Sequence, residues 1–256
     1  MRDTSHRRDR IATMLRDKGS VQVNDLIQMF AVSGVTIRKD LQFLEKQGIA
    51  TRAYGGAMLS MSNVFAIESP FERKKDINTS AKINIGKIAS DLVHSGDSII
   101  LDAGSTTLQV AANLSEKEDL TVVTNCHNII TELTPYKQIE VISLGGTLRR
   151  KSNSFYGKSA EHALQRLHVD KLFLGVDGFH MERGITTHFE AEAELNRVMC
   201  SISSEVIVVT DSSKFGNICL HKILEPKNVT KVVTDNAIQP EYLEGLKKLG
   251  IETIVV

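Results

Sequence analysis

The chain has 256 residues, of which 41% are apolar and 24% are charged. This composition excludes an intrinsically disordered chain, and the length exceeds the usual single domain of about 100 to 150 residues, so we expect two folded domains. The formal net charge is zero, but residues 1–56 carry ten Lys/Arg against six Asp/Glu, whereas residues 57–256 carry 21 against 25. A basic N-terminal part on an acidic body suggests a polyanionic partner for that first part.

The cysteines, histidines and apolar runs exclude several other classes of protein. Cys126, Cys200 and Cys219 show neither a CxxC spacing nor a disulfide framework, and the eight histidines have no metal-ligand spacing. No apolar run reaches the roughly 18 residues of a membrane span, and the charged N-terminus is unlike a signal peptide. We therefore expect a cytoplasmic protein that uses no metal, no cofactor and no membrane.

Residues 1–56 are predicted to form a winged helix-turn-helix. Apolar residues at helical spacing predict a first helix over 7–18, and Asn24 is a suitable N-cap for a short second helix. Ser33 can cap a third helix that runs over about 34–47. Residues 49–56 then have the pattern of a short β-wing that ends in two glycines.

The third helix has one apolar stripe and one polar face. Ile37, Leu41 and Leu44 form the stripe, so the opposite face offers cationic, amide and hydroxyl groups of the kind that contact bases and phosphates in a major groove. Any small three-helix bundle also has a polar outer face, but here it coincides with a capped third helix and a wing. The candidate DNA-binding residues are Ser33, Val35, Thr36, Arg38, Lys39, Gln42 and Lys46 of the helix, and Arg52 and Tyr54 of the wing.

Residues 57–75 lack a clear periodicity and are predicted to be a linker, followed by an α/β domain over 76–256. In this second domain, short apolar runs alternate with helical patterns, which predicts a parallel sheet covered on both faces. The predicted strands are 98–101, 120–123, 139–144, 171–174, 206–209, 231–233 and 253–256, and the predicted helices are 80–93, 107–114, 126–133, 160–167 and 191–203.

Small and polar residues follow the C-terminal ends of these strands, where open α/β sheets bind ligands. Residues 104–107 (GSTT) open a helix after a strand, which suits a phosphate, although an ordinary Ser/Thr-capped turn has the same pattern. Because five polar strand ends converge, we favour a binding site. From the strand ends, its candidate residues are Asp102, Gly104, Ser105, Thr106, Thr107, Thr124, Asn125, Gly145, Gly146, Gly175, Asp177 and Gly178.

Two stretches of the first domain resemble the DNA-binding signature of the DeoR family of sugar-metabolism repressors. They are residues 32–41 (VSGVTIRKDL) and 52–56 (RAYGG), and the family often has Arg where this chain has Lys39. Lysine keeps the charge but lacks the bidentate fork, so phosphate contact is the simpler expectation for it.

The second domain resembles the family's sensor domain at residues 101–107, 124–125, 145–149, 175–178, 184–187 and 211–215. The resemblance implies a fold similar to ribose-5-phosphate isomerase and a phosphorylated sugar as effector. It adds Arg149, Thr186, Glu192 and Lys214 to the candidate effector site; by themselves, Glu192 and Lys214 read equally well as solvated charges. Residues 149–150 and 154–157, among others, resemble a subgroup that regulates amino-sugar use, which implies N-acetylgalactosamine-6-phosphate or galactosamine-6-phosphate.

The sequence thus favours a repressor of a sugar or aminosugar operon that binds double-stranded operator DNA as a homo-dimer or homo-tetramer. The alternative is a sugar-phosphate isomerase-like enzyme with an accessory N-terminal DNA-binding domain, in which Glu192 or Asp102 could act as a base. A fold shared with enzymes does not carry their activity, and we assign no catalytic residue.

Overall fold

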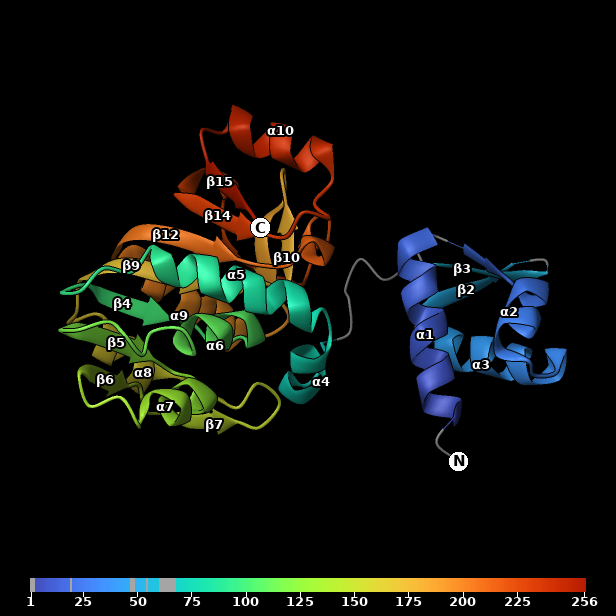
Figure 1. The fold of residues 1–256 in the computed structure, drawn as a ribbon, viewed down its shortest axis with the longest axis horizontal. Helices are drawn as coiled ribbons and strands as arrows, with labels where there is room; N and C mark the ends of the chain where they lie inside the picture. The colour runs from blue at the N-terminus through green and yellow to red at the C-terminus, as the bar shows by residue number, and fades with distance from the viewer. Residues whose placement is uncertain (1–2, 19, 47–48, 54, 60–67) are drawn as a thin grey trace. The chain divides into compact units, whose positions relative to one another are not determined.

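The computed structural model describes residues 3–18, 20–46, 49–53, 55–59 and 68–256. The chain divides into two compact units, Met1–Phe65 and Ala66–Val256 (Figure 1). Each unit has its own hydrophobic core, as expected for two domains.

The first unit, the head, is a winged helix-turn-helix, as the sequence predicts. Its helices are α1 (Asp3–Lys18), α2 (Val23–Phe30) and α3 (Gly34–Lys46). Its strands β1 (Ser20–Gln22), β2 (Ala50–Ala53) and β3 (Gly56–Leu59) form an antiparallel sheet in the order β1-β3-β2. The wing is therefore a hairpin whose second strand runs past residue 56, and β1 adds a strand that the sequence did not indicate.

The start of α2 differs from the prediction. The helix begins at Val23, its N-cap residue is Gln22, and no side chain caps it, so Asn24 is not the cap. The physical reason is that Val23 is buried and its backbone N–H donates to the carbonyl of Gly55 in the wing at 2.9 Å. The wing thus satisfies a group that a capping side chain would otherwise satisfy.

The second unit, the sensor domain, contains a seven-stranded parallel sheet in the order β15-β14-β12-β9-β4-β5-β6. The sequence predicts all seven strands. Their bounds are β4 Ser98–Leu101, β5 Leu120–Thr124, β6 Ile139–Ser143, β9 Val169–Leu174, β12 Ser203–Val209, β14 Lys231–Thr234 and β15 Glu252–Val255.

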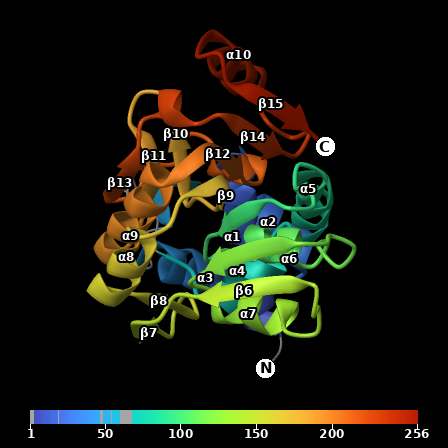
Figure 2. The same ribbon diagram turned by 90° about the vertical axis from the view of Figure 1, so that its left-hand side faces the viewer.

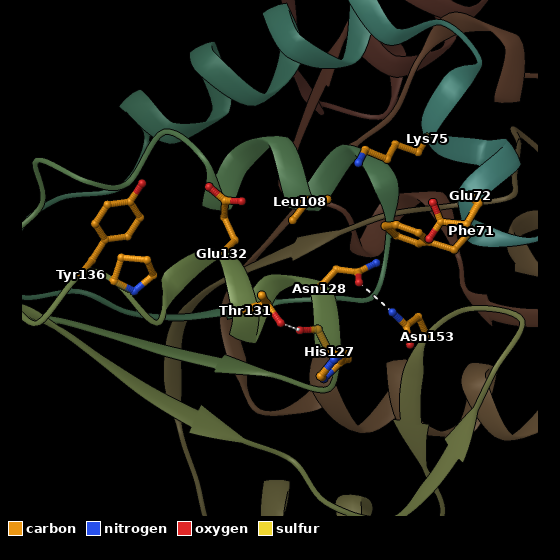
Figure 3. A pocket seen from close by; sticks show the side chains of 11 residues that line it. Phe71, Glu72, Lys75, Leu108, His127, Asn128, Thr131, Glu132, Tyr136 and Asn153 are labelled. Atoms are coloured by element: carbon orange, nitrogen blue, oxygen red, sulfur yellow. Dashed lines mark hydrogen bonds between the residues drawn. The ribbon is translucent and has the colours of Figure 1, made fainter.

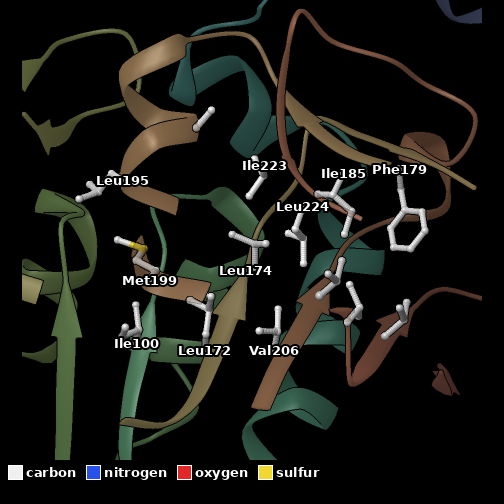
Figure 4. Packing of buried hydrophobic residues seen from close by; sticks show 14 of the residues in the cluster. Ile100, Leu172, Leu174, Phe179, Ile185, Leu195, Met199, Val206, Ile223 and Leu224 are labelled. Atoms are coloured by element: carbon white, nitrogen blue, oxygen red, sulfur yellow. The ribbon is translucent and has the colours of Figure 1, made fainter. Parts of the chain in front are cut away.

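Helices cover both faces of this sheet, as predicted (Figures 1 and 2). Alternate strand residues point to opposite sides: Ile99 packs in one buried cluster, and Ile100 packs in the other (Figure 4). One face carries α4 (Phe71–Asp76), α5 (Thr79–Asp91), α6 (Ser105–Ala111) and α7 (His127–Leu133), and the other carries α8 (Lys158–Leu164) and α9 (Glu190–Ser201).

Several elements of the sensor domain were not predicted. Helix α4 begins in the predicted linker and ends one residue beyond it, and α6 begins at Ser105, two residues earlier than expected. The other additions are α10 Pro240–Lys248, the hairpin of β7 Thr147–Arg149 and β8 Ser154–Tyr156, the three-stranded sheet of β10 Gly178–His180, β11 Gly184–Thr187 and β13 His221–Leu224, and the short 3-10 turns η1 Ser212–Lys214 and η2 Pro226–Asn228.

Candidate functional site

The third helix of the head presents the predicted polar face. Ser33 Oγ accepts a hydrogen bond from the backbone N–H of Thr36 at 3.3 Å, which confirms the predicted cap. Thr36 is half-buried and Tyr54 lies outside the described residues. The remaining candidates are exposed, namely Ser33, Val35, Arg38, Lys39, Gln42, Lys46 and Arg52.

In the sensor domain, the C-terminal ends of the strands bring together three carboxylates and a lysine. Asp102 follows β4, Asp177 follows β9, and Glu192 lies in the first turn of α9. The ammonium of Lys74, from α4, lies 2.5 Å from Asp177 Oδ1. The Thr187 hydroxyl joins two of the carboxylates, because it lies 2.9 Å from Glu192 Oε1 and 3.2 Å from Asp177 Oδ2.

Burial and charge give these three carboxyl groups very different pKa values. Burial raises the pKa of Asp102 to about 7, helped by the charge of Asp177. Burial, Asp177 and Asp102 together raise the pKa of Glu192 to about 8. Burial also opposes ionisation of Asp177, but the charges of Lys74, Lys214 and His188 outweigh it and hold its pKa at about 2. Near neutral pH, Asp177 is therefore the ionised member of the cluster and Glu192 is largely neutral.

These pKa values predict how stability changes with pH. The folded pKa of Asp102 exceeds the ordinary aspartate pKa of 3.8, so its contribution to the free energy of unfolding is fully present below pH 3.8 and is lost as the pH rises through about 7. We therefore expect Asp102→Asn to raise the melting temperature by at least about 2 °C at pH 9, with a gain that shrinks toward pH 5. Melting curves at the two pH values measure this, and a gain that does not depend on pH would contradict it.

Two buried acceptor oxygens at neighbouring strand ends have no hydrogen-bond partner within the described part of the chain. They are Asp102 Oδ1 after β4 and Asn125 Oδ1 after β5, on residues that are 2% and 1% exposed. The Asn125 amide nitrogen does have a partner, since it donates to the Phe155 carbonyl at 3.0 Å. A buried oxygen without a donor is costly unless something else supplies one, so this edge of the sheet can accept hydrogen bonds from a ligand.

Other predicted residues of this site have their polar atoms engaged by the fold. The Thr107 hydroxyl donates to the Asp102 carbonyl at 2.6 Å, and the Thr124 hydroxyl donates to the Leu101 carbonyl at 2.7 Å. The Thr186 hydroxyl accepts from the backbone of Cys219 at 2.9 Å. These three hydroxyls hold the loops in place, which is the role that ordinary turn residues have.

The predicted glycines also divide into two groups. A Cβ on Gly178 would lie 2.5 Å from the Asn217 carbonyl oxygen, and Gly146 (φ +131°) approaches Tyr156 equally closely, so packing explains both. Gly145 is exposed with open space around it. Gly104 and Gly175 instead lie next to each other beside Asp102, where the backbone can approach a ligand.

Arg149 is paired within the fold rather than free. Its two terminal nitrogens each lie 2.5 Å from one oxygen of Glu68, a bidentate arrangement that lowers the pKa of Glu68 against the effect of burial. The guanidinium also lies over the ring of Phe189, 4.4 Å from its centroid. The Phe71 backbone N–H donates to the Lys151 carbonyl at 2.8 Å. The β7–β8 hairpin thus holds the segment that leads into α4.

The sequence missed the residues of this cluster that come from 68–82. Lys74 lies within the run ERKKD, which reads as a solvated charge run, and nothing in its spacing distinguishes it. Lys82 is buried, its ammonium donates to the carbonyls of Lys74 and Ile77, and burial lowers its pKa to about 8. Asn78 donates to Asp211 Oδ1 at 2.8 Å from a left-handed backbone conformation, which Asn tolerates.

His188 is another residue whose position the sequence did not indicate. Its Nε2 lies 3.9 Å from Asp177 Oδ2 and 3.5 Å from Cys219 Sγ. Burial lowers the pKa of His188 despite the nearby charge of Asp177. No metal-binding group of three or more His, Cys, Asp or Glu occurs among the residues that the structure describes.

A separate groove of about 550 Å³ lies between α4, α6, α7 and the β7–β8 turn (Figure 3). Its wall includes the Asn153 amide, which donates to Asn128 Oδ1 at 2.6 Å. None of the predicted effector residues lines it. The groove and the carboxylate cluster are therefore different places on the sensor domain.

Comparison with known proteins identifies both units. Residues 7–63 match the family model of the DeoR-like helix-turn-helix domain, and residues 77–236 match that of the DeoR C-terminal sensor domain. The chain belongs to the DeoR family. It is a DNA-binding transcription regulator, as the sequence predicts, and no described helix is long and apolar enough to cross a membrane.

Relatives that are similar over nearly the whole chain are also named as transcriptional repressors. A protein of Escherichia coli O157:H7 named for transcriptional repression of the aga operon is 47% identical, with 99% of this chain and 94% of that protein covered. The transcriptional repressor GlcR of Bacillus subtilis (strain 168) is 33% identical, with 96% and 93% covered. Among solved structures, ribose 5-phosphate isomerase from Methanocaldococcus jannaschii is similar over 55% of this chain and 56% of that one, with 18% identity and a TM-score of 0.41.

Proposed function

We propose that the regulator represses an operon for sugar or aminosugar use. A phosphorylated sugar, which binds at the strand ends of the sensor domain, controls the affinity of the regulator for its operator. The observation that carries this proposal is the pair of buried oxygens on Asp102 and Asn125, which have no partner among the described residues. The charge of Lys74 acts on Asp102, and the charges of Lys74 and Lys214 both act on the neighbouring Asp177. Acceptors for sugar hydroxyls and cations for a phosphate thus occur at one edge of the sheet. The name of the Escherichia coli relative supports an amino-sugar operon.

The chemistry of the cluster divides between the two ends of such a ligand. Asp102 and Asn125 accept hydrogen bonds from hydroxyl or amine groups. Lys214 makes no ion pair among the described residues, so its ammonium is available to the phosphate, and the hydroxyls of Ser105 and Thr106 lie at the start of α6. N-acetylgalactosamine-6-phosphate and galactosamine-6-phosphate are the ligands we propose to test first.

Helix α4 gives the ligand a route to the rest of the chain. Lys74 reaches the carboxylate cluster from α4, and Glu68 and Phe71 at the start of that helix are held by the β7–β8 hairpin. A ligand phosphate that competes with Asp177 for Lys74 therefore acts on the segment that follows the head. An effector controls operator binding only if it prefers one conformation or assembly, and α4 is where we place that difference.

Thermal melting of the full-length protein with a panel of sugar phosphates tests the ligand. A ligand at about 100 times its Kd adds roughly 2.7 kcal/mol of stability, which raises the melting temperature measurably. We expect a rise with an aminosugar phosphate and none with the same sugar lacking phosphate. An equal rise in melting temperature with the phosphorylated and the unphosphorylated sugar would show that the site does not recognise the phosphate.

An isomerase-like activity is the second candidate, favoured only by the pKa values of about 7 and 8 for Asp102 and Glu192, which are in the range of general bases. The named relatives are transcription repressors, and a winged head has no use in isomerisation. We propose that the regulator is not an enzyme. Turnover of ribose-5-phosphate or galactosamine-6-phosphate by the purified protein would reverse this proposal.

We propose that a homo-dimer or homo-tetramer places two heads on a palindromic operator and that the exposed face of α3 contacts the DNA. On this basis Lys39→Ala should weaken operator binding and reduce the slope of log K against log salt by about 0.9, the value for one lost phosphate contact. Binding isotherms at several salt concentrations measure it. The matched control is Lys87→Ala, an exposed lysine of α5, which should change neither quantity.

A slope that stays unchanged in Lys39→Ala would remove Lys39 from the phosphate contacts. A slope that falls equally in Lys87→Ala would show that the effect reflects total charge rather than the surface of α3.

A further inference from the structure

A buried carboxylate lies on the helix that we expect to read DNA. Asp40, in the middle of α3, is 1% exposed, although the nearby residues Lys39 and Gln42 on the same helix are exposed. Arg7 Nε lies 2.6 Å from Asp40 Oδ2, and Arg8 Nε lies 2.7 Å from Asp40 Oδ1. Both carboxylate oxygens are therefore bound by neighbouring arginines of α1.

Arg8 also contacts the next turn of α3. Its guanidinium carbon lies 4.0 Å from the centroid of the Phe43 ring, and Phe43 is 41% exposed. Because Asp40 and Phe43 are three residues apart, they lie one above the other on the helix. Arg8 thus binds two successive turns of α3 through an ion pair and a cation–π contact.

A buried ion pair is a weak source of stability, because removing both charges from water offsets most of their attraction. Its best-attested use is to select one arrangement of the packed elements. An apolar contact between α1 and α3 tolerates small rotations and shifts, whereas a carboxylate bound by a nitrogen on each oxygen does not.

We propose that Arg7, Arg8 and Asp40 form a positioning cluster that fixes the orientation of α3, so that sequence-specific recognition depends on residues that face away from the DNA-contacting face. Base-edge contacts require side chains placed within hydrogen-bond distance, whereas attraction to phosphates tolerates displacement. The cluster therefore affects specific binding far more than non-specific binding.

Arg8→Ala in the full-length protein tests this proposal, because Arg8 is the less buried arginine, with 26% of its side chain exposed. The specific probe is a duplex selected by the wild-type chain from a random pool, and the non-specific probe is a random duplex of the same length. We expect affinity for the selected duplex to fall at least about tenfold, the effect of about one lost base contact. Affinity for random duplex and the salt slope should stay unchanged.

Other roles of Arg8 give different results. If Arg8 binds a phosphate directly, both affinities fall and the salt slope drops by about 0.9. If Arg8 only maintains folding, both affinities fall by the same factor as the folded fraction of the head, measured by circular dichroism. Either result overturns the proposal.

A second variant tests the same cluster without leaving a fully buried charge, because Arg8, which remains, has 26% of its side chain exposed. Replacing Asp40 and Arg7 together, by Asp40→Leu and Arg7→Met, keeps the contact packed and should preserve folding. We expect this double variant to lose the ratio of specific to non-specific affinity, whereas Arg10→Ala, an exposed arginine on α1, should preserve that ratio. A double variant with the wild-type ratio would contradict a positioning role.

Discussion

Lys74→Met should abolish the response of operator binding to the sugar-phosphate effector. The Lys74 ammonium is bound to the buried Asp177, and we propose that the ligand phosphate competes with Asp177 for it. Its loss also leaves the Asp177 charge without this partner, so we expect the free energy of unfolding of the sensor domain to fall by about 3 kcal/mol. Operator titrations with and without the effector measure the response, and melting of the sensor domain measures the stability.

The neighbouring Lys75 provides the matched control, because it is an exposed lysine on the same short helix. Lys75→Met should retain both the effector response and the stability. Adding Asp177→Asn to Lys74→Met removes the unpaired charge and should restore stability but not the response. A Lys74→Met protein that still responds to the effector would exclude Lys74 from the site.

Glu68→Gln should leave effector binding intact but remove the effect of the effector on operator affinity. Glu68 lies three residues before α4, and Arg149 binds both of its carboxylate oxygens, so we do not expect it to contact the ligand. We expect the effector to raise the melting temperature as in the wild type. Its effect on operator affinity should fall from the 5- to 150-fold range typical of allosteric coupling to less than about twofold.

Lys151→Met is the control for this variant. Lys151 also contacts Glu68, at 3.3 Å, but its side chain is 40% exposed, and such surface pairs contribute little. It should retain the coupling. If the effector no longer raises the melting temperature of Glu68→Gln, Glu68 belongs to the ligand site. If the effector still changes operator affinity as in the wild type, the contact between Glu68 and the β7–β8 hairpin does not couple the ligand to operator binding.

The sequence predicts the parts of the fold that depend on local pattern. The strands of the parallel sheet are continuous apolar runs, because both of their faces are buried, and that signal needs no knowledge of their partners. The third helix of the head is predicted for the same reason, from the stripe of Ile37, Leu41 and Leu44 and the cap at Ser33. The β7–β8 hairpin and the β10-β11-β13 sheet were missed because their short strands mix polar and apolar residues and so lack the continuous apolar run of the parallel strands.

The candidate site depends on contacts between residues that are distant in the chain, and these could not be predicted from the sequence. Strand-end positions were predictable from topology, so the sequence places Asp102 and Asp177 at the same edge of the sheet, where they lie. Lys74 was not among the predicted residues, because its partner Asp177 is 103 residues away in the chain. Arg149 was named from the family resemblance, and its pairing with Glu68, 81 residues away, could not be predicted from the sequence. Asp40 was missed for the same reason, since its buried position depends on Arg7 and Arg8 of another helix.

We propose that this regulator couples operator binding to the binding of a phosphorylated sugar. The most direct measurement is the affinity of the full-length protein for its selected operator duplex as an aminosugar phosphate is added, with the unphosphorylated sugar as a parallel series. We expect operator affinity to change at least about fivefold with the phosphorylated sugar and to stay constant with the unphosphorylated sugar. Constant operator affinity across the whole panel of sugar phosphates, at concentrations that saturate any melting shift, would contradict it.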